Sequence, residues 1–225
     1  MFELLLTAIA LIGGFSAGIY DLITTNIPDK VCILMISSGI ALHILNGFLT
    51  GDFTSLLFSL IFGDTLLIFS LLMYYFGQWG GGDGELLIAI GVLLPNLSFS
   101  KSYFPFAISF FINSFFVGVV YSILYVIIFA FKDRSVRRNF LKIFKSGFYK
   151  KIPVSKLKVD DMIGEDIPRL KIYKKFLRGL SKEEVKKIKK IKKYVIIREG
   201  IRYGIVFPLA LLFTLFFGDF FFLFL

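Results

Sequence analysis

The chain has 225 residues, of which 56% are hydrophobic and 18% aromatic, and its formal net charge is +10. Its mean hydropathy of +0.79 excludes an ordinary soluble domain, because a single core of this size could not bury so much apolar surface. The one cysteine, Cys32, excludes an internal disulfide bond and a cysteine-based metal cluster. It lies in an apolar run, and we expect it to be a small buried core residue.

Apolar runs of near 20 residues predict transmembrane helices. We expect six of them, at about 2–20, 31–49, 54–76, 85–99, 103–131 and 203–225. The first run lacks a basic start and an A-x-A cleavage site, so we interpret it as a membrane helix and not as a signal peptide. The fourth is short, which favours a tilted or partly interfacial helix. The predicted fold class is an all-α polytopic membrane protein with a small insertion before its last helix.

The positive charge is concentrated between residues 132 and 203. This segment holds 24 of the 26 Lys and Arg residues and 8 of the 16 acids, a net charge of +16, whereas the rest of the chain carries −6. The positive-inside rule therefore predicts that the segment is cytoplasmic. We expect a membrane domain at 1–131, a basic cytoplasmic subdomain at 132–202 and a last helix at 203–225. Six crossings then place the 20–30 and 77–84 loops in the cytoplasm, and the 50–53 and 100–102 loops outside.

Two acids at predicted helix ends, Asp21 and Asp83, reach the same membrane face in this topology, although 62 residues separate them. Charged residues at membrane depth cost about 2.5–3.5 kcal/mol each at a helix centre and are a functional hypothesis by default. The alternative, that both acids only cap helices, stays open. A glycine cluster surrounds the second acid and indicates a sharp turn or a close approach of another backbone; it comprises Gly80, Gly81, Gly82 and Gly84.

Paired carboxylates can catalyse peptide hydrolysis without a metal, a cofactor or a covalent nucleophile. Two carboxyl groups within a few ångströms share a proton, so that one can deprotonate a water while the other polarises a peptide carbonyl. The chain has one histidine, His43, which makes a histidine-based triad implausible. An H-E-x-x-H zinc motif does not occur in the sequence. We therefore expect no metal and no cofactor.

Two motifs resemble those of a known family. The sequence Gly80-Gly81-Gly82-Asp83, which opens a short apolar segment, resembles the second catalytic motif of the GxGD membrane aspartyl proteases. The stretch "YDLITTNIPD", with Asp21, Ile27 and Pro28, resembles the first motif of their prepilin-peptidase branch. Six helices, a basic insertion and "GIVFPLALL" are similar to the archaeal preflagellin and type IV prepilin peptidases.

The resemblance implies that Asp21 and Asp83 form a catalytic dyad. It also implies substrates that are archaellin or type IV pilin-like precursors, whose short basic leader is cleaved at the cytoplasmic face of the cell membrane. Glu85 replaces a Lys that is common in bacterial members, and the chain starts directly at its first helix, so we expect cleavage without methylation. The acids Asp29 and Glu85 suit a basic leader. Glycines 80–82 would let an extended peptide approach by strand addition, and Pro208 would lie beside the dyad together with Phe207, Leu209 and Ala210.

Rival functions stay open at this stage. A presenilin-like GxGD protease would cut within a membrane segment, an ion-coupled transporter would use Asp21, Asp64 and Asp83 as ion sites, and a scaffold would tolerate loss of both motif acids. Inverted repeats, which would favour a transporter, are not seen. Asp64 lies within a predicted helix, far from the cytoplasmic face. A structural role is expected for it, with His43 as the candidate partner of its carboxylate.

The basic insertion contains one clear helical pattern. Ser181 and Glu184 have capping-box spacing, and apolar residues recur at helical spacing as far as Val195. The lysine-rich face of this helix would lie either on anionic lipid headgroups or in solvent around a small packed subdomain. Nucleic-acid binding is not expected, since aromatic residues do not alternate with the basic ones. Four acids before the helix are expected to pair with it, with binding of the substrate leader as the alternative: Asp160, Asp161, Glu165 and Asp166.

Overall fold

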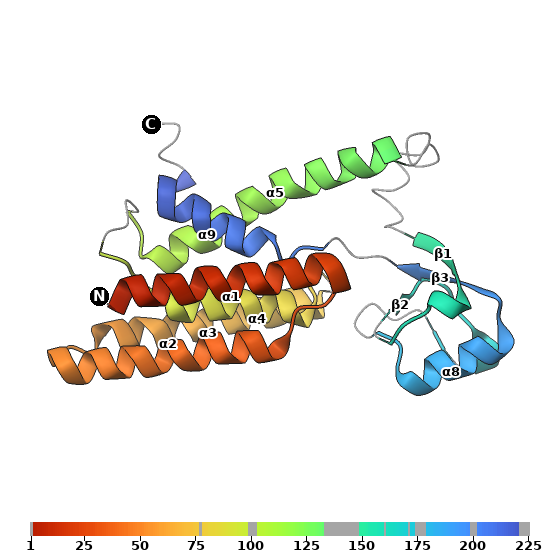
Figure 1. The fold of residues 1–225 in the computed structure, drawn as a ribbon, viewed down its shortest axis with the longest axis horizontal. Coiled ribbons are helices and arrows are strands. Elements are labelled where there is room, and N and C mark those ends of the chain that lie inside the picture. The colour runs from red at the N-terminus through yellow and green to blue at the C-terminus, as the bar shows by residue number, and fades with distance from the viewer. Residues whose placement is uncertain are drawn as a thin grey trace. The chain divides into compact units, whose positions relative to one another are not determined.

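The computed structural model describes residues 2–76, 78–98, 103–132, 149–159, 161–170, 172–173, 179–198 and 202–220. The chain divides into two compact units, Met1–Ile123 with Arg202–Leu225, and Leu124–Ile201. The first unit is helical, and the second contains a small sheet and a helix (Figure 1).

The helical unit is built from α1 (Phe2–Thr24), α2 (Asp29–Thr50), α3 (Thr54–Tyr75), α4 (Gly81–Leu93), the first part of α5 (Phe106–Lys132) and α9 (Val206–Phe217). Within the described part of the chain, four helical stretches are long and apolar enough to cross a membrane: Phe2–Thr24, Asp29–Thr50, Thr54–Tyr75 and Phe106–Ile128. These correspond to the predicted first, second, third and fifth spans.

The other two predicted spans form shorter helices. In place of 85–99, α4 covers 13 residues, and in place of 203–225, α9 covers 12. At 1.5 Å per residue these helices extend about 20 Å, which is less than the hydrocarbon thickness of about 30 Å. Residues 221–225 of the last predicted span lie outside the described residues. Six crossings therefore remain a prediction, whereas four candidate spans are observed.

The short helix α4 lies at the centre of the helical unit. It packs against α1, α2 and α3, and Figure 1 shows it beside α1 with α2 and α3 next to it. Its sequence is apolar on all sides, as expected of a helix that neighbouring helices surround. Leu86, Leu87, Ile90 and Leu93 are fully buried. The predicted core residue Cys32 is also buried.

The long helices end where the local sequence favours it. Pro28, with φ −75° and ψ 111°, precedes α2 because proline cannot donate a backbone hydrogen bond. Gly51 ends α2 with φ 73°, a left-handed conformation that favours glycine. Asp52 then accepts hydrogen bonds from the hydroxyl and the amide of Thr54, which lower the pKa of Asp52 below its usual value.

The second unit corrects the prediction of an all-α chain. It contains strands β1 (Tyr149–Pro153), β2 (Met162–Ile163) and β3 (Tyr194–Arg198), the helix α8 (Lys182–Ile191), and two 3-10 turns at Val154–Lys156 and Pro168–Leu170. The strands form an antiparallel sheet in the order β1-β3-β2, with Lys151 opposite Ile196 and Ile163 opposite Ile197. The β-branched residues of "YVIIR" favour a strand, so the chain is mostly, not entirely, helical.

The predicted helix of the insertion begins at the expected residue and ends earlier. Ser181 and Glu184 form the capping box as predicted, but the helix stops at Ile191, and Val195 belongs to β3. Val185 and Ile188 are buried in a core inside the second unit, while the lysines of α8 are exposed. The apolar face of α8 thus packs within its own subdomain.

One of the four expected acids pairs with a basic residue that directly follows this helix. Glu165 forms a 3.0 Å ion pair with Lys192 and accepts the amide of Ile196 at 3.1 Å. Asp161 accepts the amide of Lys158 at 2.7 Å. Asp160 lies outside the described residues.

Candidate active site

Asp21 lies near the end of α1 and is buried, with 6% of its surface exposed. Its Oδ2 accepts a hydrogen bond of 3.0 Å from the amide of Gly204, just before α9. Arg202, also just before α9, donates from its guanidinium to the carbonyl of Leu22, which lies in the same turn of α1 as Asp21. The positive charge of Arg202 acts on Asp21. Asp21 therefore does not cap a helix; it bonds to a segment far away in the sequence.

Asp83 is in the first turn of α4 and is partly buried. Its Oδ2 accepts a hydrogen bond from the amide of Gly80 at 3.1 Å. This carboxylate therefore caps the start of its helix, as the alternative for this acid predicts. Gly82, which directly precedes Asp83, and Gly204, which donates to Asp21, both lie against Ile27. The structure thus brings Asp21 and Asp83 to the same end of the helical unit, as the sequence predicts.

Ile27 occupies the space between the segments that carry the two acids. A Cβ atom on Gly82 would lie 2.7 Å from the Cβ of Ile27, and one on Gly204 would lie 2.9 Å from its Cδ1 and 3.0 Å from the Oδ2 of Asp21. Ile27 is buried, with 4% exposed. Ile27 of the first motif therefore contacts Gly82 of the second motif and Gly204 before α9.

The four glycines around Asp83 differ in what surrounds them. Gly82 meets Ile27, and a Cβ on Gly84 would lie 2.8 Å from the Cβ of Ser70 on α3, whereas one on Gly81 would meet no atom within 4 Å. None of the four has a positive φ. Close approach of other chain segments, and not a left-handed turn, explains Gly82 and Gly84.

Glu85 lies one residue beyond the glycine cluster, with a second acid nearby. Its Oε2 is buried and has no hydrogen-bond partner among the residues that the structure describes. The charge of Asp29, at the start of α2, acts on Glu85, and the charge of Glu85 acts on Cys32. The expected acids Asp29 and Glu85 are therefore close enough to influence each other beside the dyad.

Aromatic side chains pack around Trp79, close to the start of α4. The ring of Trp79, just before the glycines, is 6.1 Å from that of Tyr203 and 5.7 Å from that of Phe207. The charge of Asp83 acts on Tyr203. Sequence reasoning identified Phe207 but missed Trp79, Tyr203, Gly204 and Arg202. An aromatic residue before the glycines and the "RYG" triplet before the last helix were the available signals.

Pro208 lies in the first turn of α9, where a missing amide is tolerated, and it is buried. It packs against α1, since a Cβ on Gly14 would lie 3.4 Å from the Cβ of Pro208. Of its predicted neighbours, Phe207 contacts Trp79, Ala210 is buried and Leu209 is exposed.

Asp64 and His43 do not belong to this site. Asp64 is on an exposed face of α3, and the Nε2 of His43 lies 3.2 Å and 3.3 Å from the carbonyl oxygens of Val92 and Leu93. Ser59 donates to the carbonyl of Val92 at 2.8 Å. His43 thus serves the carboxyl end of α4, where carbonyl groups lack partners within the helix.

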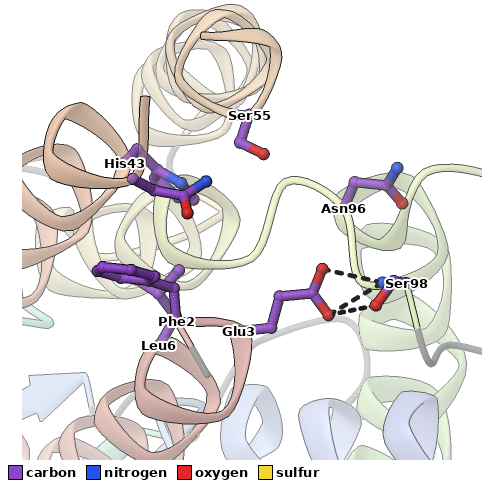
Figure 2. Close-up of a pocket in the computed structure, with 8 residues that line it drawn as sticks. Phe2, Glu3, Leu6, His43, Ser55, Asn96 and Ser98 are labelled. Carbon is purple, nitrogen blue, oxygen red and sulfur yellow. Dashed lines mark hydrogen bonds between the residues drawn. The ribbon is translucent and has the colours of Figure 1, made fainter. Parts of the chain in front are cut away.

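A polar cavity of about 280 Å³ lies beside His43. Figure 2 shows the Glu3 carboxylate directed at Ser98, whose amide and hydroxyl donate to it at 3.2 Å and 2.6 Å. The cavity adjoins the first turn of α1, whereas Asp21 is five turns later, about 27 Å along the helix axis. It is therefore distinct from the dyad. Its lining consists of Phe2, Glu3, Leu6, His43, Asn46, Ser55, Asn96 and Ser98.

Comparisons with known proteins bear on this site. The family model described as the type IV leader peptidase family matches residues 8–123, which include both aspartates. A preflagellin peptidase of Methanococcus voltae is 30% identical over 138 residues, 57% of this chain and 58% of that protein. The aligned region therefore spans less than two thirds of this curated relative.

Proposed function

The chain belongs to the type IV leader peptidase family, and we propose that it is a membrane aspartyl endopeptidase with Asp21 and Asp83 as its catalytic residues. The observation that carries the proposal is geometric: Ile27 lies against Gly82, which directly precedes Asp83, and against Gly204, which donates its amide to Asp21. In the sequence the two aspartates are far apart, so that only the fold pairs them.

The proposed mechanism uses the pair as acid and base. Two carboxyl groups at close range share one proton, because both cannot be ionised cheaply. The ionised group takes a proton from a water molecule, whose oxygen attacks the carbonyl carbon of the scissile peptide bond. The protonated group donates a hydrogen bond to the carbonyl oxygen. When the C–N bond breaks, the leaving nitrogen takes the proton that the carboxylate removed from the water, so that the carboxyl pair again holds one proton.

We propose archaellin or type IV pilin-like precursors as substrates. The family description and the preflagellin peptidase relative support this class. A basic leader suits a site at which Asp29 and Glu85 add negative charge close to the dyad. An extended peptide could pass over Gly81, where a Cβ would meet no protein atom within 4 Å, and its backbone could pair with the enzyme's by strand addition.

The proposed location is the cell membrane, with the dyad facing the cytoplasm. The four candidate spans support a multi-pass membrane protein, and the net charge of +16 between residues 132 and 203 supports a cytoplasmic position for that segment. Asp21 and Asp83 then lie at the same face as the basic leader of a membrane-anchored precursor.

The experiment that tests the proposal is cleavage of purified precursors in membranes that contain this protein. An archaellin precursor and a pilin precursor are assayed in parallel, with wild type and with Asp21→Asn, Asp83→Asn and Asp64→Asn at equal abundance. We expect wild type and Asp64→Asn to shorten at least one precursor, since Asp64 lies on an exposed face of α3. Asp21→Asn and Asp83→Asn are expected to leave both precursors intact. Cleavage by either of these two variants at the wild-type rate would overturn the dyad.

A further inference from the structure

The four residues directly before α9, Arg202–Ile205, contact segments that carry both motif aspartates. We call them the strap. On one side the strap bonds to the end of α1, and on the other it packs on Trp79, which precedes Asp83. Neither motif includes these residues.

The α1 side of the strap is held by hydrogen bonds and by close packing. Gly204 donates its amide to Asp21 at 3.0 Å, and Arg202 donates to the carbonyl of Leu22. A Cβ on Gly18 would lie 2.9 Å from the Cα of Ile205 and 3.2 Å from the carbonyl oxygen of Gly204. The backbone of the strap therefore lies against α1, one turn before Asp21.

The other side of the strap reaches the segment that carries Asp83. The ring of Tyr203 packs on Trp79 at 6.1 Å and on Phe207 at 5.8 Å. A Cβ on Gly118 would lie 1.6 Å from the Tyr203 hydroxyl oxygen, so that α5 accommodates this hydroxyl only because residue 118 is glycine. Tyr121, also on α5, donates its hydroxyl to the carbonyl of Arg202 at 2.9 Å.

We propose that the strap is a positioning element of the catalytic site, which fixes the carboxylate of Asp21 relative to Asp83. This inference rests on the proposed function. A charge-assisted bond from a backbone amide fixes the orientation of a carboxylate, and the Arg202 guanidinium adds positive charge near it. Because a displacement of 1 Å in a catalytic site can cost about 100-fold in rate, strap residues act on turnover without touching the substrate.

Two glycines of α1 provide a matched test. Gly18 faces the strap backbone, whereas a Cβ on Gly14, one turn earlier, would make only an ordinary contact of 3.4 Å with Pro208. We expect Gly18→Ala to lower kcat about 10- to 100-fold with KM close to wild type, and to lower the unfolding temperature in detergent, because the added methyl group meets the strap backbone. Gly14→Ala is expected to match wild type in all three. Equal kcat losses in both variants, or none in Gly18→Ala, would overturn the proposal.

Arg202 provides a second test that a purely structural role would not pass. Arg202→Gln removes the charge and the guanidinium that donates to Leu22, and we expect kcat to fall about 10-fold. Arg202→Lys keeps both a charge and a donor and is expected to recover most of the lost activity without a change in KM. If Lys and Gln are equally impaired, or if the loss of kcat follows a loss of thermal stability, the positioning role is wrong.

The design separates this inference from the proposed function. Asp21→Asn is assayed beside the strap variants on the same precursors. If wild type cleaves neither precursor, or if Asp21→Asn cleaves as wild type does, the proposed function fails. If wild type cleaves, Asp21→Asn is inactive and the Gly18 and Arg202 variants turn over at the wild-type rate, only the positioning role fails.

Discussion

Ile27 packs directly on Gly82, so that a Cβ at position 82 would lie 2.7 Å from the Cβ of Ile27. The first residue lies in the loop after α1, and the second is in the first turn of α4. This contact joins the segment after Asp21 to the segment that carries Asp83, and it depends on the absence of a side chain at position 82.

Gly82→Ala is therefore expected to impair both stability and activity. The added methyl group meets a buried, branched side chain that cannot swing away, and overpacking of this kind costs about 1–3 kcal/mol. We expect a lower unfolding temperature in detergent and at least a tenfold lower rate of precursor cleavage. Gly14→Ala, whose added Cβ makes an ordinary 3.4 Å contact, is the control. Wild-type behaviour of Gly82→Ala would show that the two motifs do not need this contact.

Gly81→Ala tests the path of the substrate separately from the packing of the protein. A Cβ at this position would meet no protein atom within 4 Å, so we expect the unfolding temperature to stay at the wild-type value. If an extended precursor passes over this residue, KM rises several-fold while kcat changes less. An unchanged KM would mean that the substrate takes another route to the dyad.

The two aspartates could be predicted to share a membrane face because that step needed only helix count and charge, whereas their pairing as a dyad was implied by the family resemblance. Under the positive-inside rule the excess of basic residues between 132 and 203 predicts a cytoplasmic position for that segment, and six predicted crossings then put Asp21 and Asp83 at one face. Ile27 and Pro28 followed from their motif. None of these inferences required knowledge of which helices are neighbours.

The strap, and the packing of Trp79 on Tyr203 and Phe207, could not be predicted in the same way. The bond between Gly204 and Asp21 joins residues at opposite ends of the chain, and the packing of Trp79 on Tyr203 depends on how α9 meets α4. Hydrophobic periodicity gives no information on such contacts. Likewise, the early end of α8 reflects pairing of Val195 with Ile152 across β1 and β3, a tertiary contact that overrides helical spacing.

The carboxyl end of α4 should depend on polar side chains from two neighbouring helices. Ser59 donates to the Val92 carbonyl at 2.8 Å, and His43 Nε2 is 3.2 Å from the same oxygen. Ser59→Ala should cost about 1 kcal/mol, whereas Ser59→Ala combined with His43→Leu leaves a buried carbonyl unsatisfied and should cost about 1–3 kcal/mol more. Unfolding in detergent measures both losses. Ser37→Ala, which removes only an exposed bond within α2, should change nothing.

The core of the second unit can be tested with two isoleucines of α8. Ile188 is fully buried, whereas Ile191 is 51% exposed. Ile188→Ala should cost about 2–5 kcal/mol through the cavity that it leaves, and Ile191→Ala well under 1 kcal/mol. Trypsin digestion of the full-length protein should therefore cut the lysine-rich segment of the Ile188 variant much faster than that of wild type. Equal rates for the two variants would contradict the assigned core.

Trp79 offers a direct signal for substrate binding, because it is the only tryptophan in the chain. Its ring packs on those of Phe69 and Phe115. The charge of Asp83 acts on Tyr203, which also contacts Trp79. In Asp83→Asn, which should bind the precursor without cleaving it, we expect the tryptophan emission to change with precursor concentration. The midpoint should lie near the wild-type KM if substrate dissociation is faster than chemistry.

The control for this titration is the mature substrate, the archaellin or pilin without its leader. It should leave the tryptophan emission unchanged if the enzyme recognises the basic leader. A change with both proteins would mean that the apolar helix of the substrate, and not its leader, contacts the region of Trp79. No change with the full precursor, at concentrations well above KM, would contradict an approach of the substrate past Trp79. In that case the open side of Gly81 would not be the entrance to the dyad.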